Sequence, residues 1–282
     1  KTPLRYPGGK SRAVKHILPH IPEGVERVCS PFFGGGSVEL ALANRGIQVF
    51  GYDKMKQLVW FWQGLCGDNN KLADEVEKLR EQYLIRNGDI VTGCSKEAFH
   101  QYREDLKIET FMFSYERAAK YYIINRSGFS GATFSGGWSE RASYARFTES
   151  SVQRLRDFNA QKFRVDYADF EDAIFYHPKA FLYLDPPYML KGSQNSLYGV
   201  DGNLHDSFDH ERLHGILTNR AGWLMSYNDC PEIRDMYKDY EIVEAEWSYG
   251  MTNVYSKEEK KKKAEEGYVK KQKQSSEILI KG

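Results

Sequence analysis

The chain of 282 residues is long enough for one large α/β domain or one domain with an insertion, and too short for two full catalytic units. Its net charge of +1 excludes a general polycation, so any contact with nucleic acid must come from a local patch. Four scattered cysteines without a histidine cluster argue against a zinc site or a disulfide framework, and without a long apolar segment or a signal-peptide pattern we expect a soluble, intracellular, cytoplasmic protein.

The N-terminal segment, residues 3–10, is rich in turn-forming residues and precedes a helix predicted over residues 11–18. Its two consecutive glycines allow the backbone to approach a ligand closely or to reverse direction. Lys10 stands directly before the helix. It either faces a ligand or is an ordinary solvated lysine of an N-terminal arm.

A strand predicted over residues 27–33 leads into three successive glycines at 34–36, and a helix follows over residues 37–44. Strand, glycine loop and helix in this order are typical of a nucleotide-binding βα turn. The spacings of a dinucleotide fingerprint and of a P-loop are both absent, so the loop indicates a ligand against the backbone without requiring a pyrophosphate. The next strand, residues 47–53, ends in Asp53, which either accepts hydrogen bonds from ribose hydroxyls or caps the helix that follows.

The character of the chain changes at residues 68–159, where we expect a helical insertion. Apolar residues recur at helical spacing over residues 72–83 and 99–106, and a third helix is predicted after them. The main domain therefore consists of residues 1–67 and 160–282, interrupted by this helical domain.

An arm follows the third helix of the insertion. Residues 125–138 combine glycines, hydroxyls and aromatic rings in a loop or hairpin, and Arg141 and Arg146 follow closely. Such an arm could follow a phosphate backbone and push a ring into a base stack. A surface loop packed by its own aromatic rings is the alternative.

The sheet resumes with a strand at residues 163–167, and Asp169 and Phe170 follow at a turn into a helix. Residues 180–184 are nearly all apolar or aromatic and do not alternate with polar residues, which predicts a strand buried on both faces. This strand ends in the sequence D-P-P-Y at residues 185–188.

The D-P-P-Y turn is stiff because neither proline donates a backbone N–H and each fixes its own φ. The carboxylate of Asp185 and the carbonyl of Pro186 could accept both hydrogens of an exocyclic amine on an aromatic ring and draw its lone pair out of conjugation. The ring of Tyr188 could then stack on that base. The alternative is a plain strand-to-loop turn whose acid caps a neighbouring group.

The remaining elements are predicted from the same patterns. They are a polar flap (189–208), a helix (209–219), a strand (222–227), a helix beginning near Pro231, and a closing hairpin (240–247 and 276–280). The connection at residues 257–273 is dense in lysine. We interpret it as a solvated loop, and only secondarily as a phosphate contact.

Together these pieces resemble the Dam-like N6-adenine DNA methyltransferases, class alpha amino-methyltransferases with a D-P-P-Y motif. The matching residues are Y-P-G-G-K (6–10), P-F-F-G-G-G-S-V (31–38), Asp53, N-R-S-G-F-S-G (125–131), Asp169-Phe170 and D-P-P-Y (185–188). They follow the family's order of cofactor motif, target-recognition insertion and catalytic motif. The resemblance implies a Rossmann-like α/β sheet whose helical insertion recognises the target.

The resemblance implies S-adenosylmethionine bound over the sheet, with S-adenosylhomocysteine as product and no metal. Tyr6 and Lys10 would line its methionine end, Asp53 would hold the ribose, and Asp169 with Phe170 would meet the adenine ring. The full set of implied cofactor residues is Tyr6, Lys10, Phe33, Gly34, Gly36, Asp53, Asp169, Phe170 and Asp185.

The resemblance also implies double-stranded DNA as partner and a target adenine that leaves the duplex. Asp185 and the Pro186 carbonyl would accept hydrogen bonds from N6 while Tyr188 stacks on the base. Phe129 could fill the space that the base leaves. The implied DNA-binding residues are Asn125, Arg126, Phe129, Ser130 and Arg141.

Two positions depart from the family pattern. Ser30 stands where many relatives have an acid, so one contact to the cofactor's amino group is missing or supplied elsewhere. Ser130 and Phe134 stand where GATC-methylating members have Asn and Arg, so GATC specificity is not carried over. The same chemistry on RNA adenine or a protein glutamine amide, a catalytically silent DNA-binding protein, and a companion restriction endonuclease all stay open at this point.

Overall fold

The computed structural model describes residues 1–84, 88–108, 112–159, 161–189, 208–245 and 277–282. The predicted flap, apart from its two ends, and the lysine-rich connection at 257–273 lie outside these residues. Within them, no helix is long and apolar enough to cross a membrane. All four cysteines are free, as the sequence predicts.

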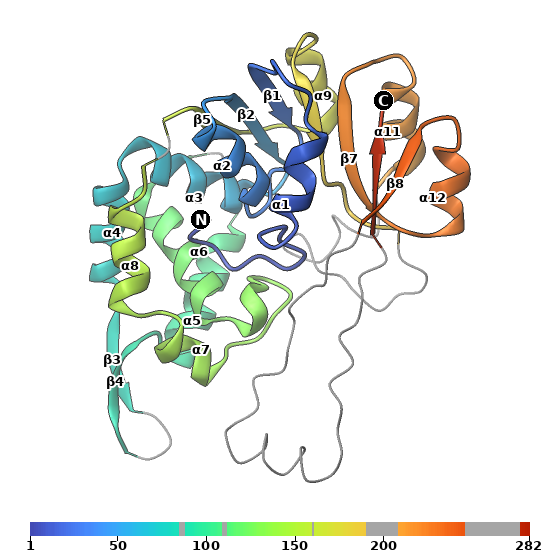
Figure 1. Cartoon of the computed structure of the whole chain (residues 1–282). Helices are drawn as coiled ribbons and strands as arrows, with labels where there is room; N and C mark the ends of the chain where they lie inside the picture. Colours follow the sequence, from blue (N-terminus) through green and yellow to red (C-terminus); the bar gives the residue numbers. More distant parts are fainter. Residues whose placement is uncertain (85–87, 109–111, 160, 190–207, 246–276) are drawn as a thin grey trace.

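A seven-stranded mixed sheet forms the centre of the main domain (Figure 1). Its order is β5-β2-β1-β6-β7-β9-β8, and the first five strands are parallel while β9 pairs antiparallel with β7 and β8. The strands are β1 (Arg27–Ser30), β2 (Gln48–Asp53), β5 (Phe163–Tyr167), β6 (Phe181–Leu184), β7 (Trp223–Asn228), β8 (Glu241–Ala245) and β9 (Glu277–Lys281). The sheet confirms the predicted Rossmann-like α/β class.

Alternate residues of the buried strands pack into two separate cores. In β6, Leu182 and Leu184 face one core and Tyr183 faces the other, because successive side chains of a strand point to opposite faces. Helices on both faces complete these cores. One core includes residues of α1 (Val14–Ile17), η1 (Leu18–His20), α2 (Ser37–Asn44) and α3 (Lys56–Gly67), and the other includes residues of α9 (Phe170–Tyr176), α11 (His210–Leu217) and α12 (Pro231–Met236).

The strand order indicates at which edge of the sheet a ligand binds. From β1 the chain proceeds to β2 and β5 on one side, and it then returns to β6 and β7 on the other side. The order therefore reverses between β1 and β6, and ligands of open α/β sheets bind outside the carboxyl ends of the strands at such a point. The D-P-P-Y turn directly follows β6 at this position.

Between α3 and β5 the described residues form five further α-helices and a hairpin, drawn from cyan to yellow-green in Figure 1. They are α4 (Asn69–Lys78), the hairpin of β3 (Glu81–Leu84) and β4 (Ile90–Gly93), α5 (Lys96–Lys107), α6 (Tyr115–Ser127), α7 (Glu140–Ala145) and α8 (Glu149–Arg156). Helix α6 is buried over most of its length, and Tyr122 stacks on Phe61 of α3 at 5.6 Å between ring centroids. The insertion is therefore packed directly on the main domain.

One predicted helix is shorter than its apolar spacing suggests. The prediction over residues 72–83 is wrong at its end, because α4 stops at Lys78 and Tyr83 lies in β3. Tyr83 pairs with Val91 of β4, and its hydroxyl contacts Ser143 of α7. Cross-strand pairing and this contact override a helical spacing that continues by coincidence.

We predict that Gly51→Ala lowers the free energy of unfolding by about 1–3 kcal/mol, because overpacking a filled core costs that much. Gly51 lies in the middle of β2, and an added Cβ would overlap the ring of Phe33, which is 2% exposed. Chemical denaturation measures the change. Gly215→Ala in α11 is the control, since its Cβ would meet nothing within 4 Å. Equal stability of Gly51→Ala and the wild type would contradict this packing.

Candidate active site

The D-P-P-Y turn is held in place by the neighbouring strand β7. Ser226 donates its hydroxyl to Asp185 Oδ1 at 2.8 Å. Asn228 bonds both backbone groups of Met189: its Oδ1 accepts from the N–H at 3.0 Å and its Nδ2 donates to the carbonyl at 2.9 Å. Neither Ser226 nor Asn228 was in the predicted site, because no local pattern connects β7 with a turn about forty residues earlier in the chain.

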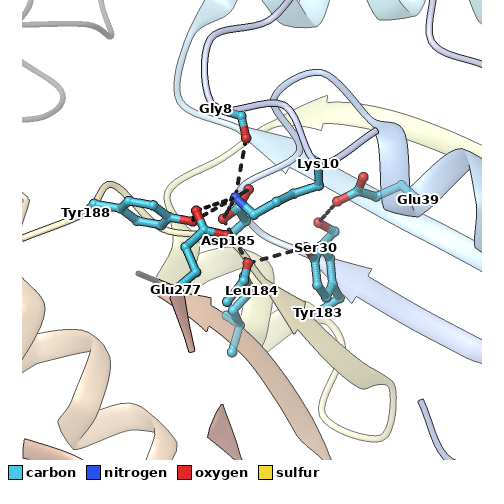
Figure 2. Close-up of polar contacts among 10 residues, drawn as sticks. Gly8, Lys10, Ser30, Glu39, Tyr183, Leu184, Asp185, Tyr188 and Glu277 are labelled. Carbon is cyan, nitrogen blue, oxygen red and sulfur yellow. Dashed lines mark hydrogen bonds and ion pairs between the residues drawn. The ribbon is translucent and has the colours of Figure 1, made fainter. Parts of the chain in front are cut away.

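The ring of Tyr188 is fixed at one face and at its hydroxyl. It stacks on Tyr227 of β7, with 5.8 Å between centroids and 23° between the ring planes. Its hydroxyl donates to Glu277 Oε1, at the start of β9. Figure 2 shows the Tyr188 hydroxyl and the Glu277 carboxylate next to each other, beside Lys10. The ring is therefore rigidly presented at the carboxyl edge of the sheet.

The Lys10 ammonium lies at the centre of this edge (Figure 2). Its Nζ is 2.7 and 2.9 Å from the two carboxylate oxygens of Asp185 and 2.8 Å from the Tyr188 hydroxyl, with the Gly8 carbonyl at 3.3 Å. The Lys10 side chain is 4% exposed, whereas that of Asp185 is 23% exposed. The N-terminal segment thus brings a nitrogen donor to the carboxylate that was predicted to accept one.

A buried acid of helix α2 lies beside the last residue of β1. Ser30 donates its hydroxyl to Glu39 Oε1 at 2.7 Å, and both side chains are buried. Burial raises the pKa of Glu39 to about 7, and the negative charge of Asp185 adds to this effect while the Lys10 charge opposes it. Glu39 was not in the predicted set; an acid in the first turn of the helix after a glycine loop was the available signal.

The glycine loop closes against Tyr6. Gly34 and Gly36 have φ values of 50° and 65°, in the region that favours glycine. An added Cβ would lie 3.0 Å from the Tyr6 ring at Gly34 and 2.7 Å from Tyr6 Cβ at Gly35. Side chains in this loop would therefore push Tyr6 away from the edge of the sheet.

Asp53 fixes the same loop. Its Oδ2 accepts the Gly34 N–H and its Oδ1 accepts the Met55 N–H, both at 2.9 Å. Burial raises the pKa of Asp53 to about 6, although these backbone donors oppose the shift. The carboxylate thus connects the end of β2 with the loop after β1 and the start of α3.

The two successive phenylalanines before the glycine loop point in opposite directions. Phe33 does not present its ring to the site: the ring is in the core, 5.1 Å from Trp62 and 5.9 Å from Phe163 between centroids. Phe32 stacks instead on Phe170, at 5.7 Å and 29°. Phe33 can therefore line the site only with its backbone, and its neighbour Phe32 presents the ring.

Asp169 begins α9 and is surrounded by cations. It accepts from the Glu171 N–H at 3.2 Å, from Lys54 Nζ at 2.9 Å and from Arg212 Nη2 at 3.2 Å. Burial alone would raise the pKa of Asp169, but these hydrogen bonds and charges hold it below its ordinary value. The Arg212 guanidinium also lies 4.8 Å from the centroid of Phe170. Lys54 and Arg212 were not predicted as neighbours of this acid.

Two of the predicted DNA-binding side chains are buried. Asn125 Nδ2 donates to the carbonyls of Arg5 (2.7 Å) and Gly131 (3.0 Å), and its Oδ1 accepts the Arg5 N–H at 3.0 Å. Arg126 donates to the Arg146 carbonyl at 2.9 Å, and its burial lowers its pKa to about 10. Asn125 therefore joins the N-terminal segment to the arm, and Arg126 joins α6 to the residue after α7, so neither side chain faces solvent.

The other three predicted DNA-binding residues are accessible. Phe129 is 66% exposed at the start of η2 (Phe129–Gly131), and Arg141 is exposed. Ser130 has a φ of 55°, a left-handed conformation that is uncommon for serine. Phe134, by contrast, is buried, and Arg103 Nη2 bonds its carbonyl at 2.6 Å. The arm therefore projects one aromatic ring and keeps the other inside.

A family model described as D12 class N6 adenine-specific DNA methyltransferase matches residues 6–251. The matched region contains all of the predicted site residues, from Tyr6 to Tyr188, and ends before β9. Glu277 therefore lies outside it. No curated protein matches the chain.

Proposed function

We propose a role for each residue of this site in a chain that belongs to the D12 class of N6 adenine-specific DNA methyltransferases. The chain transfers a methyl group to N6 of adenine in DNA, and its methyl donor is S-adenosylmethionine. Our proposal concerns what the family leaves open: which side chains hold the donor, which side chains hold the adenine, and how the insertion contacts DNA.

The chemistry of the residues at this edge fits the cofactor. S-adenosylmethionine carries ribose hydroxyls, an aminated purine, an ammonium and a carboxylate, and it supplies a methyl group activated by its sulfonium. The edge presents acids after β2 and β5, an aromatic pair of Phe32 and Phe170, a glycine loop, and the charged groups of Lys10 and Glu39. Each chemical group of the cofactor therefore has a complementary partner along one edge.

We propose that Asp53, Asp169 and Phe170 hold the adenosine end of the cofactor, together with Phe32, which was not in the predicted set. Asp53 would accept from the ribose hydroxyls with lone pairs that its two backbone donors leave free. Phe170 and Phe32 would contact the adenine ring. Asp169 would accept from its amino group, for which its contacts with Lys54 and Arg212 hold it in the ionised form.

For the methionine end, we propose Tyr6, Lys10, the backbone of Phe33, Gly34 and Gly36, and the Glu39 carboxylate. Glu39 would supply the acid that Ser30 does not, since its Oε1 lies 2.7 Å from the Ser30 hydroxyl. The acid thus reaches the end of β1 from helix α2 instead of from the strand itself. The cofactor's ammonium would favour the ionised form of Glu39.

We predict that cofactor binding near pH 6 releases protons from the wild type and fewer from Glu39→Gln. With a pKa of about 7, Glu39 is mostly protonated at pH 6 and must lose its proton to pair with an ammonium. At pH 8 it is already ionised, so the release shrinks. Titration calorimetry in buffers of different ionisation enthalpy measures the release. Equal release and equal affinity in both proteins at pH 6 would remove Glu39 from the cofactor site.

For the target adenine, we propose Asp185, the Pro186 carbonyl and Tyr188. The observation that carries this proposal is the Lys10 ammonium, which donates to both oxygens of Asp185 and so supports a role for this carboxylate as the acceptor of an amine. An N6 amine in its place would donate to Asp185 and Pro186, which leaves the nitrogen lone pair free for the methyl group. The extra proton leaves N6 after transfer, so Asp185 need not be a strong base.

We predict that Asp185→Asn lowers the rate of methyl transfer by about 10²-fold or more, because the amide replaces a charged acceptor at the reacting nitrogen. The affinity for S-adenosylmethionine should change by less than about threefold, because the amide keeps one oxygen, which can accept from both Ser226 and Lys10. Radiolabelled methyl incorporation into DNA and cofactor titration measure the two effects. Asp166→Asn, at the exposed end of β5, is the control. Wild-type transfer by Asp185→Asn would refute the catalytic assignment.

For DNA, we propose residues 68–159 as the target-recognition domain and residues 1–67 and 160–282 as the catalytic domain. Phe129, Ser130 and Arg141 would contact duplex DNA directly, whereas the buried Asn125 and Arg126 would position the arm. The exposed ring of Phe129 would fill the space of a flipped-out adenine.

We expect this chain to recognise its DNA sequence with side chains at other positions than the GATC-specific members use. The Phe134 side chain is 4% exposed and cannot reach a base edge, and Ser130 offers only a hydroxyl. Sequencing DNA from cells that express the chain, with detection of modified bases, would give the site. A companion restriction endonuclease, the further partner that we propose, would have to cut at the same DNA sequence.

We predict that Phe129→Ala weakens binding to duplex DNA about tenfold, the effect of losing one aromatic–base stack. It should also lower the fluorescence of 2-aminopurine placed at the target position, because the flipped state loses its filler. Phe175→Ala is the matched control, since Phe175 is 80% exposed on α9, which lies outside the insertion. If both variants bind DNA equally well, Phe129 does not contact the duplex.

A further inference from the structure

Glu277 is a buried acid on the strand that the family model does not cover. It is the first residue of β9, opposite Asn228 of β7 in the antiparallel pairing. Its side chain is 2% exposed. A carboxylate removed from water is costly unless charges or hydrogen bonds compensate it, so its partners indicate its role.

Two side-chain partners of Glu277, Tyr188 and Lys10, lie at the D-P-P-Y turn (Figure 2). Its Oε1 accepts the Tyr188 hydroxyl and lies 3.9 Å from Lys10 Nζ. Lys10 in turn contacts Asp185 at 2.7 Å and the same Tyr188 hydroxyl at 2.8 Å. A single buried ammonium is thus shared by two carboxylates at unequal distances.

The unequal distances matter when the target adenine arrives. The N6 amine needs the acceptor atoms of Asp185 that Lys10 now occupies. Lys10 is 4% exposed, and an ammonium buried to this extent needs a carboxylate or another acceptor beside it. Glu277 is already within 3.9 Å and can take over the pairing with a small movement of the lysine side chain.

We propose that Glu277 is a positioning residue for methyl transfer, acting through Lys10 and Tyr188. It holds the Tyr188 hydroxyl and becomes the principal partner of Lys10 when the target amine displaces that ammonium from Asp185. The inference rests on the proposed roles of Asp185 and Tyr188. It makes the C-terminal strand a part of the active site as well as an edge of the sheet.

Three variants separate the charge of Glu277 from its shape. Glu277→Gln keeps the size and an acceptor for Tyr188 but removes the charge. Glu277→Asp keeps the charge on a shorter side chain. Glu241→Gln is the matched control, because Glu241 lies in the adjacent strand β8 and pairs with Lys281 at 2.7 Å on the surface, with 62% of its side chain exposed.

We expect Glu277→Gln to slow single-turnover methylation of duplex DNA about tenfold or more, since Lys10 then stays on Asp185. The dissociation constant for S-adenosylmethionine should change by less than about threefold, and the melting temperature should not fall. Glu277→Asp should recover part of the lost rate, and Glu241→Gln should match the wild type.

Two results would overturn the inference. The first is a Glu277→Gln enzyme as fast as the wild type or faster than Glu277→Asp, which would show that the charge is not used. The second is a loss of rate matched by an equal loss of cofactor affinity and a lower melting temperature, which is the behaviour of a purely structural contact. A wild-type enzyme unable to methylate DNA in this assay would contradict the proposed function instead.

Discussion

The proposed active site depends on the buried ammonium of Lys10. Lys10 comes from the N-terminal segment, yet it lies between the acid that follows β6 and the acid that begins β9. Asp185 and Glu277 would repel each other in a buried site without that charge, and Tyr188 would lose a donor. The ammonium therefore holds together three parts of the chain: the N-terminal segment, the turn after β6 and the start of β9.

The sheet explains why such distant residues can meet. Its parallel strands end at one edge, so the residues that follow β1, β2, β5 and β6 form a continuous row there. The antiparallel β9 runs in the opposite direction, and this is why its first residue, Glu277, reaches the same edge as Asn228 at the end of β7. Helix α6 packs against α3, and Asn125 at its end bonds the N-terminal segment, so the arm is held next to the domain that contains the sheet.

Features encoded locally could be predicted from the sequence. The buried strand before Asp185, the turn stiffened by two prolines and the glycine loop each depend on a few consecutive residues, and the fold class follows from their order. Features that depend on long-range packing could not. The choice between Phe32 and Phe33 depends on which face the end of β1 presents, and the burial of Asn125 depends on a segment 120 residues away. Glu277 contacts Tyr188, which is 89 residues earlier in the chain, and no local sequence pattern indicates this contact.

We propose that Asp185 exchanges the Lys10 ammonium for the N6 amine of a flipped adenine. A crystal structure of the enzyme with duplex DNA and a non-reactive cofactor analogue would reveal this exchange. We expect N6 within hydrogen-bonding distance of both Asp185 and the Pro186 carbonyl, the base stacked on Tyr188, and Lys10 moved toward Glu277. A complex in which Lys10 still contacts both oxygens of Asp185 while the target adenine binds elsewhere would contradict it.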